Sequence, residues 1–141
     1  MTKLKNLFLI LPLTVFGLYS CSSDDSTSGS VALEGKWQFT RIGTFTDNQE
    51  ILTDYQHTPG CTKDYIEILP GGIIKNHEFN NPNCQETIST GTWTRNNNSI
   101  TVRYPDQPAI PGEILELTST TLKTKFTQPD ITDIEIFIRI P

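Results

Sequence analysis

The sequence predicts an all-β protein, an antiparallel up-and-down β-barrel of about eight strands. From Val31 onward, apolar residues recur with the period of two that is typical of strands, not with the 3.6-residue period of a helix. Turn-forming residues separate these short alternating runs. No window of a dozen residues combines helical spacing with capping residues. The alternative is a strongly curled sandwich, but closing the sheet removes the exposed edges that favour aggregation, so a barrel is expected.

Each predicted strand is a run in which apolar and polar side chains alternate. In chain order the runs are 35–40 (GKWQFT), 63–69 (KDYIEIL), 72–79 (GIIKNHEF), 86–95 (ETISTGTWTR), 98–104 (NSITVRY), 112–118 (GEILELT), 121–127 (TLKTKFT) and 131–140 (ITDIEIFIRI). The last run is the clearest, because isoleucine occupies every second position from Ile134 to Ile140. Hairpin turns are predicted at PGG, NNNS and TSTT, which lie between successive runs.

Two further stretches are rich in turn formers and are predicted as loops at the barrel mouth. They are residues 43–50 (GTFTDNQE) and 106–113 (DQPAIPGE).

The first 20 residues have the pattern of a secretion signal. Lys3 and Lys5 precede a twelve-residue apolar stretch, residues 7–18, which is short for a membrane span of about 20 residues. The stretch ends in Leu-Tyr-Ser-Cys, which resembles the lipobox of bacterial lipoproteins. The resemblance implies that residues 1–20 are a cleaved signal peptide and that Cys21 carries the lipid. The alternative is an uncut anchor or an ordinary signal peptide.

Residues 21–32 are predicted to be the lipidated cysteine followed by a flexible tether, because SSDDSTSGS has no apolar side chain to bury. The pair Asp24 and Asp25 close to the cysteine resembles the surface-export signal of Bacteroidota lipoproteins. The expected location is the outer membrane, with the protein at either the cell surface or the periplasmic face.

The remainder, residues 33–141, contains the segments LEGKW at 33–37, GTWTRNNNSITV at 91–102 and ILELTSTTLKTKF at 114–126. Through these segments it resembles the bacterial lipocalin-like domain of Bacteroidota lipoproteins. The resemblance implies that Trp37 packs across the closed end of a barrel. It also implies that an arginine near the last strand covers the indole ring, and Arg139 is placed to do so.

Two cysteines remain for the exported domain. Oxidising compartments favour a disulfide between Cys61 and Cys84, which is expected to stabilise the fold by roughly 3 kcal/mol. The bridge would pin the loops at the open ends of the hairpin formed by runs 63–69 and 72–79. The alternative is zinc bound by both thiols with His57 and His77, but the sequence lacks the C-x2-C spacing that makes such a prediction strong.

Charge and motifs exclude several classes of function. A net charge of −5 with scattered Lys and Arg argues against nucleic-acid binding. No G-x-S-x-G or other nucleophile setting is present. Carboxylate pairs such as Asp130 with Asp133, or Glu113 with Glu116, are interpreted as solvated. The protein is therefore predicted not to be an enzyme and to use no cofactor or metal.

The expected function is the binding of a small hydrophobic or amphipathic molecule. A barrel of eight strands either packs solid or holds one small ligand, and an apolar lining favours an apolar ligand. The predicted inward-facing residues are Trp37, Phe39, Ile66, Ile68, Trp93, Leu122, Phe126, Ile136 and Ile138. The alternative is a structural or interaction lipoprotein with a filled barrel and no ligand.

Overall fold

The computed structural model describes residues 31–80 and 83–141, and within them it has nine β-strands. The predicted signal peptide, Cys21 and most of the predicted tether lie outside the described residues. The strands are β1 (Gly35–Thr46), β2 (Gln49–Asp54), β3 (Tyr65–Leu69), β4 (Ile73–Glu78), β5 (Thr87–Asn96), β6 (Ser99–Arg103), β7 (Ile110–Leu117), β8 (Thr121–Thr127) and β9 (Thr132–Ile140).

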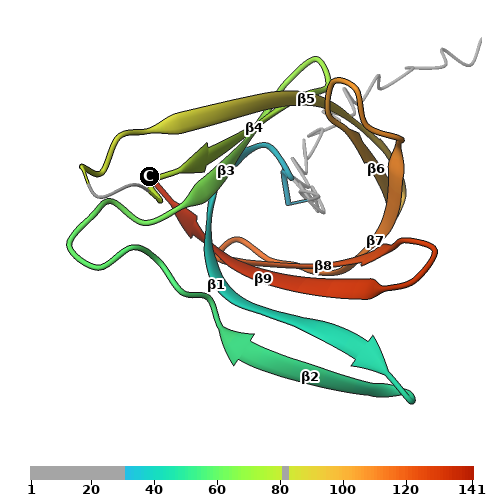
Figure 1. Ribbon diagram of the computed structural model, residues 1–141. Coiled ribbons are helices and arrows are strands. Elements are labelled where there is room, and N and C mark those ends of the chain that lie inside the picture. The colour runs from blue at the N-terminus through green and yellow to red at the C-terminus, as the bar shows by residue number, and fades with distance from the viewer. Residues whose placement is uncertain (1–30, 81–82) are drawn as a thin grey trace, which may run out of the picture.

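The strands form one antiparallel sheet that closes on itself (Figure 1). From β3 to β9 each strand pairs with the next one in the chain, and β1 pairs with both β3 and β9. The predicted all-β, up-and-down barrel is thus confirmed, with eight strands in the wall and β2 as an extra strand. In the parts of the chain that the structure describes, there is no helix of the length and apolarity that crossing a membrane requires.

The extra strand β2 corrects the predicted loop at 43–50. The chain continues as β1 to Thr46, turns at Asp47 and Asn48, and returns as β2. Both turn residues have positive φ, 51° and 59°, which Asp and Asn tolerate better than most residues and which suits a two-residue hairpin turn. The loop predicted at 106–113 is also shorter than expected, because β7 already begins at Ile110.

The β1–β2 hairpin lies beside β9 below the barrel in the view of Figure 1. Gly43 allows the two strands of the hairpin to approach closely, since a Cβ there would lie 2.0 Å from the backbone oxygen of Ile51. Glu50 of the hairpin forms an ion pair with Lys123 of β8 at 2.7 Å. Ile134 of β9, which pairs with Gly43, is fully buried. The hairpin thus shields part of the outward face of β8 and β9.

The closed end of the barrel is organised around Trp37, whose side chain is 0% exposed. Its indole Nε1–H donates to the carbonyl of Leu33 at 2.8 Å. The Arg139 guanidinium lies 4.0 Å from the centre of the ring, as the family resemblance implied. Gly35 has φ of 138°, and a Cβ there would lie 2.4 Å from the guanidinium. The glycine two residues before Trp37 in the segment LEGKW therefore makes room for the arginine.

Cys61 and Cys84 form the predicted disulfide, with a sequence separation of 23 residues. Cys61 lies in the loop that precedes β3, and Cys84 lies in the segment that follows β4. The bridge joins the open ends of the β3–β4 hairpin, as expected.

Candidate functional site

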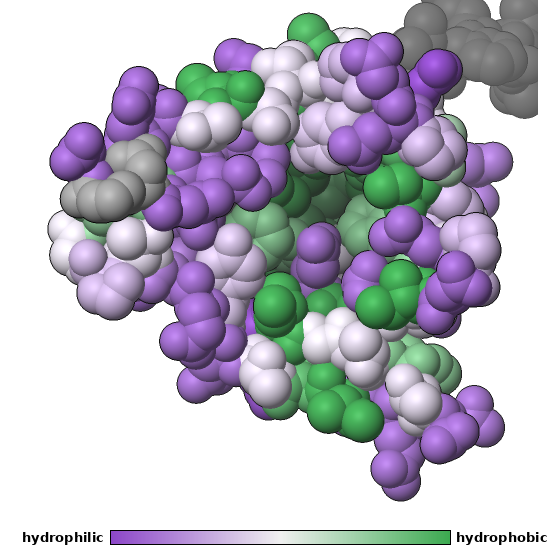
Figure 2. All heavy atoms as spheres, viewed as in Figure 1, coloured by the Kyte–Doolittle hydropathy of each residue, from purple (hydrophilic) through white to green (hydrophobic). Residues whose placement is uncertain are grey.

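The barrel contains a cavity of about 200 Å³. Figure 2 looks into its open end and shows a hollow whose depth is apolar. The cavity is lined by Phe39, Ile66, Ile68, Ile74, Asn76, Ile100, Val102, Tyr104, Ile110, Leu122, Thr124, Phe126, Gln128, Asp133, Glu135 and Phe137. These residues come from strands around the whole wall, because alternate side chains of each strand point to the barrel axis.

Five of the nine predicted inward residues line this cavity: Phe39, Ile66, Ile68, Leu122 and Phe126. Trp37 and Trp93 are not among the lining residues. Trp37 is part of the buried core at the closed end, and Trp93 is half-buried against that core. Trp93 donates its indole N–H to the carbonyl of Leu69 at 3.1 Å.

The prediction for Ile136 and Ile138 is wrong. Glu135 and Phe137 of β9 line the cavity, so the isoleucines that alternate with them lie on the outward face. Ile138 is accordingly 43% exposed. The isoleucine pattern therefore follows the outer face of β9, part of which the β1–β2 hairpin covers.

The mouth of the cavity carries two acidic residues, Asp133 and Glu135, of which the sequence interpretation had placed Asp133 in solvent. Asp133 and Glu135 stand at the start of β9, and Arg139 near its end lies over Trp37. The two carboxylates are therefore at the open end of the barrel. Gln128 donates to Asp133 Oδ2 at 3.4 Å. No sequence signal separated these carboxylates from the ordinary polar positions of a strand.

Glu135 is the most perturbed carboxyl of the described chain. Protein surrounds it, and the surface that it still exposes faces the cavity. Burial, followed by repulsion from Asp133, raises its pKa from 4.5 to about 7, and the Thr124 hydroxyl partly offsets this rise. Desolvation of this kind disfavours the charged form. The carboxyl consequently changes its charge near neutral pH.

Two neutral side chains of the lining have acceptor atoms without hydrogen bonds. Thr124 is 3% exposed, and its hydroxyl faces Glu135 without a hydrogen bond of good geometry. Asn76 Nδ2 donates to Glu78 Oε1 at 3.0 Å, and because a carboxylate only accepts, this bond sets the orientation of the amide. The amide oxygen, Asn76 Oδ1, is buried without a partner.

Tyr104 adds a phenol to the same rim. Its side chain lines the cavity. Burial, with smaller contributions from Glu135 and Glu78, raises its pKa to about 12. The phenol therefore stays neutral at physiological pH, and both carboxylates lie within electrostatic reach of it.

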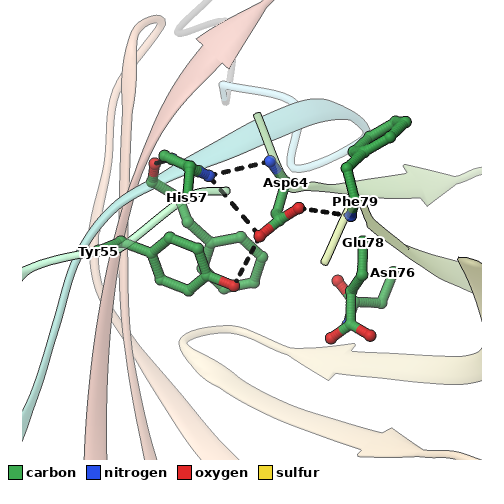
Figure 3. A network of polar contacts seen from close by, with 7 residues as sticks. Tyr55, His57, Asp64, Asn76, Glu78 and Phe79 are labelled. Carbon is green, nitrogen blue, oxygen red and sulfur yellow. Dashed lines mark hydrogen bonds and ion pairs between the residues drawn. The ribbon is translucent and has the colours of Figure 1, made fainter. Parts of the chain in front are cut away.

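A polar network holds the segment that follows β2 against the rim (Figure 3). Asp64 accepts from the Tyr55 hydroxyl at 3.1 Å and from the backbone N–H of Phe79 at 2.7 Å. His57 Nδ1 accepts from the backbone N–H of Asp64 at 3.0 Å, so its Nε2–H donates to the Phe39 carbonyl, also at 3.0 Å. The Tyr55 ring stacks on Phe39 at 4.7 Å. The network thus positions the Phe39 ring, which is part of the cavity wall.

The alternative zinc site is not assembled. The disulfide uses both cysteine thiols, and His57 uses both ring nitrogens in the network above. His77 Nδ1 instead contacts Glu86 Oε1 at 2.7 Å. Within residues 31–80 and 83–141, no group of three metal-ligating side chains is found.

A meander of antiparallel strands closed around one apolar cavity defines the class of up-and-down barrels with an internal pocket. A sequence model of the lipocalin-like domain matches residues 33–124 of the chain. The chain belongs to the lipocalin-like domain family, as the sequence resemblance implied.

Solved structures agree with this assignment at the level of the fold. A lipocalin-like protein from Bacteroides uniformis ATCC 8492 matches with a TM-score of 0.55 at 13% identity, over 77% of this chain and 98% of that one. An uncharacterized protein from Bacteroides eggerthii DSM 20697 matches with a TM-score of 0.53 at 12% identity, over 77% and 100%. Lobster apocrustacyanin A1 matches with a TM-score of 0.52 at 17% identity, over 76% of this chain and 60% of that one. No curated protein matches the chain in sequence.

Proposed function

We propose that this protein is a membrane-anchored lipoprotein of the cell envelope whose barrel binds one small, largely apolar molecule. The observation that carries the proposal is the cavity of about 200 Å³ along the barrel axis. A filled barrel would have no such space. A cavity of about 150 Å³ lined by aliphatic and aromatic side chains accommodates benzene, so this one suits a ligand built on a single ring.

The binding proposal predicts that filling the cavity abolishes binding. Val102 lines the cavity and is buried, so Val102→Phe places a ring where the ligand would lie. We expect at least a tenfold loss of affinity for 2-phenylethanol and 2-phenylethylamine, measured by calorimetry. Ile88→Phe is the matched control, because Ile88 is 49% exposed and does not line the cavity. Failure of both probes to bind the unaltered protein would contradict the proposal.

The anchoring proposal rests on the lipobox pattern at Cys21. Two or three acyl chains hold a protein on a membrane far better than one chain. Cys21→Ser is expected to move the protein from the membrane fraction to the soluble fraction of the producing cells. Mass spectrometry of the mature protein gives the second measurement: a mature chain with an unmodified Cys21 thiol contradicts the anchor.

A further inference from the structure

We infer that the ligand carries a basic amino group, which stays at the acidic mouth while its apolar body fills the barrel. The inference rests on the proposed function, since it names the chemical class of the ligand of that same cavity. The juxtaposition that carries it is an apolar cavity with Asp133, Glu135, Asn76 and Thr124 in its wall and no cation among its lining residues.

The charges at the mouth are of one sign. Asp133 and Glu135 line the cavity, and Glu78 lies on the same face of β4 as the cavity residue Asn76. None of the described residues that line the cavity is Lys, Arg or His. Arg139 is at the closed end over Trp37, and its guanidinium is bonded to backbone carbonyls there. The interior therefore offers uncompensated negative charge.

Cations nearby are directed to the outside of the barrel. Lys123 and Lys125 alternate along β8 with residues that line the cavity, and their ammonium groups pair with Glu50 and Glu113 at 2.7 and 3.1 Å. They do not neutralise Glu135. A ligand that supplies the missing positive charge would be attracted strongly to these carboxylates, because water screens charges little in an enclosed site.

The hydrogen-bonding groups point to the same ligand. An ammonium group has three donors and no acceptor. Apart from Glu135 and Asp133, the wall contributes the two acceptor atoms that lack partners, Thr124 Oγ1 and Asn76 Oδ1. Buried acceptors without partners are costly, and a protonated amine beside Glu135 can also donate to Thr124 Oγ1, because Thr124 is the direct cross-strand partner of Glu135. A ligand carboxylate would instead add an acceptor and a repelled charge.

The state of Glu135 makes the expected selectivity pH-dependent. The groups that face it are Asp133 on β9, Thr124 on β8 and the phenols of Tyr104 and Tyr55, with no basic side chain among the causes of its shift. Because its pKa in the free protein is about 7, the carboxyl is mostly ionised at pH 8 and mostly neutral at pH 5.5. The preference for an amine should therefore weaken as the pH falls.

The test compares three molecules of nearly the same shape: 2-phenylethylamine, 2-phenylethanol and 3-phenylpropionate. At pH 8, calorimetry should give an affinity for the amine about tenfold or more above that for the alcohol, the expected effect of a charged hydrogen bond. Binding of the carboxylate should be the weakest of the three. At pH 5.5 the advantage of the amine should shrink.

Glu135→Gln should remove the preference for the amine, so that the amine and the alcohol bind this variant with affinities within about twofold of each other. Glu116→Gln is the matched control, since Glu116 is exposed and does not line the cavity. Equal affinities of amine and alcohol for the unaltered protein, or an amine preference that survives in Glu135→Gln, would overturn the inference while the binding function stands. Binding of none of the three would contradict the binding function itself.

Discussion

Trp37→Ala is expected to lower the free energy of unfolding by about 4 kcal/mol, because truncating a fully buried Trp removes its transfer energy and leaves a large void. The ring is 0% exposed, and its Nε1–H bond to Leu33 is lost with it. The Arg139 guanidinium also loses the aromatic face on which it lies. Since domains of this size have about 5–15 kcal/mol of stability in total, the folded state of the variant should be only marginally stable. Urea denaturation followed by circular dichroism measures the loss.

Trp93→Ala is the matched control for this experiment. Trp93 is only half-buried and has one comparable indole hydrogen bond, so we expect about half the loss, roughly 2 kcal/mol. Trp37→Phe keeps an aromatic face under Arg139 and should fold even where the alanine variant does not. A smaller loss at Trp37 than at Trp93 would contradict the assignment of Trp37 as the centre of the closed end.

Glu135→Gln is expected to stabilise the protein by an amount that grows as the pH rises from 4.5 to 7 and is full above pH 7. The folded-state pKa of this carboxyl is about 7, raised from 4.5 by burial and by Asp133. Below pH 4.5 the group is neutral in both states and costs nothing. Between pH 4.5 and 7 the unfolded chain ionises first, so stability falls as the pH rises. Above pH 7 the full cost is present, roughly 3 kcal/mol.

The amide lacks this cost, so the difference between the variant and the unaltered protein should grow from near zero at pH 4.5 to roughly 3 kcal/mol at pH 8. For a domain of this size the gain corresponds to a rise in Tm of roughly 10 °C. The two proteins share their other titrating groups, so the contributions of those groups cancel in the difference between the two free energies of unfolding. Glu116→Gln should stay within about 0.5 kcal/mol at every pH. A gain from Glu135→Gln that does not change with pH would refute the buried charge.

The barrel could be predicted from the sequence because alternation and turn chemistry act locally. Alternating runs, such as those that contain Trp37, Ile66 and Leu122, predict the strands, and the turn residues between successive runs predict that neighbouring strands pair as a meander. The β1–β2 hairpin was missed because its residues are polar at the turn and its return strand, Gln49–Asp54, has little apolar alternation. Its pairing with β1 is decided by a two-residue turn at Asp47 and Asn48, which resembles a loop in composition.

The error at β9 follows from the same omission. Alternation shows that the isoleucines share a face but not which face points inward. Because the hairpin provides a second apolar environment, with Ile134 fully buried, the outward face of β9 could be the more apolar one. Inward-facing isoleucines at 136 and 138 would have placed Glu135, which alternates with them, toward solvent. Its place in the cavity depends on packing between distant segments, and no local pattern in the sequence contains that information.

The described chain enters the barrel at its closed end. Arg139 donates to the carbonyls of Ala32 and Glu34, which ties the first described residues to the closed pole. An attachment through the residues before Val31 therefore reaches the barrel at its closed end, opposite the mouth of the cavity. Under the anchoring proposed above, the lipid would therefore be connected to the pole opposite the opening.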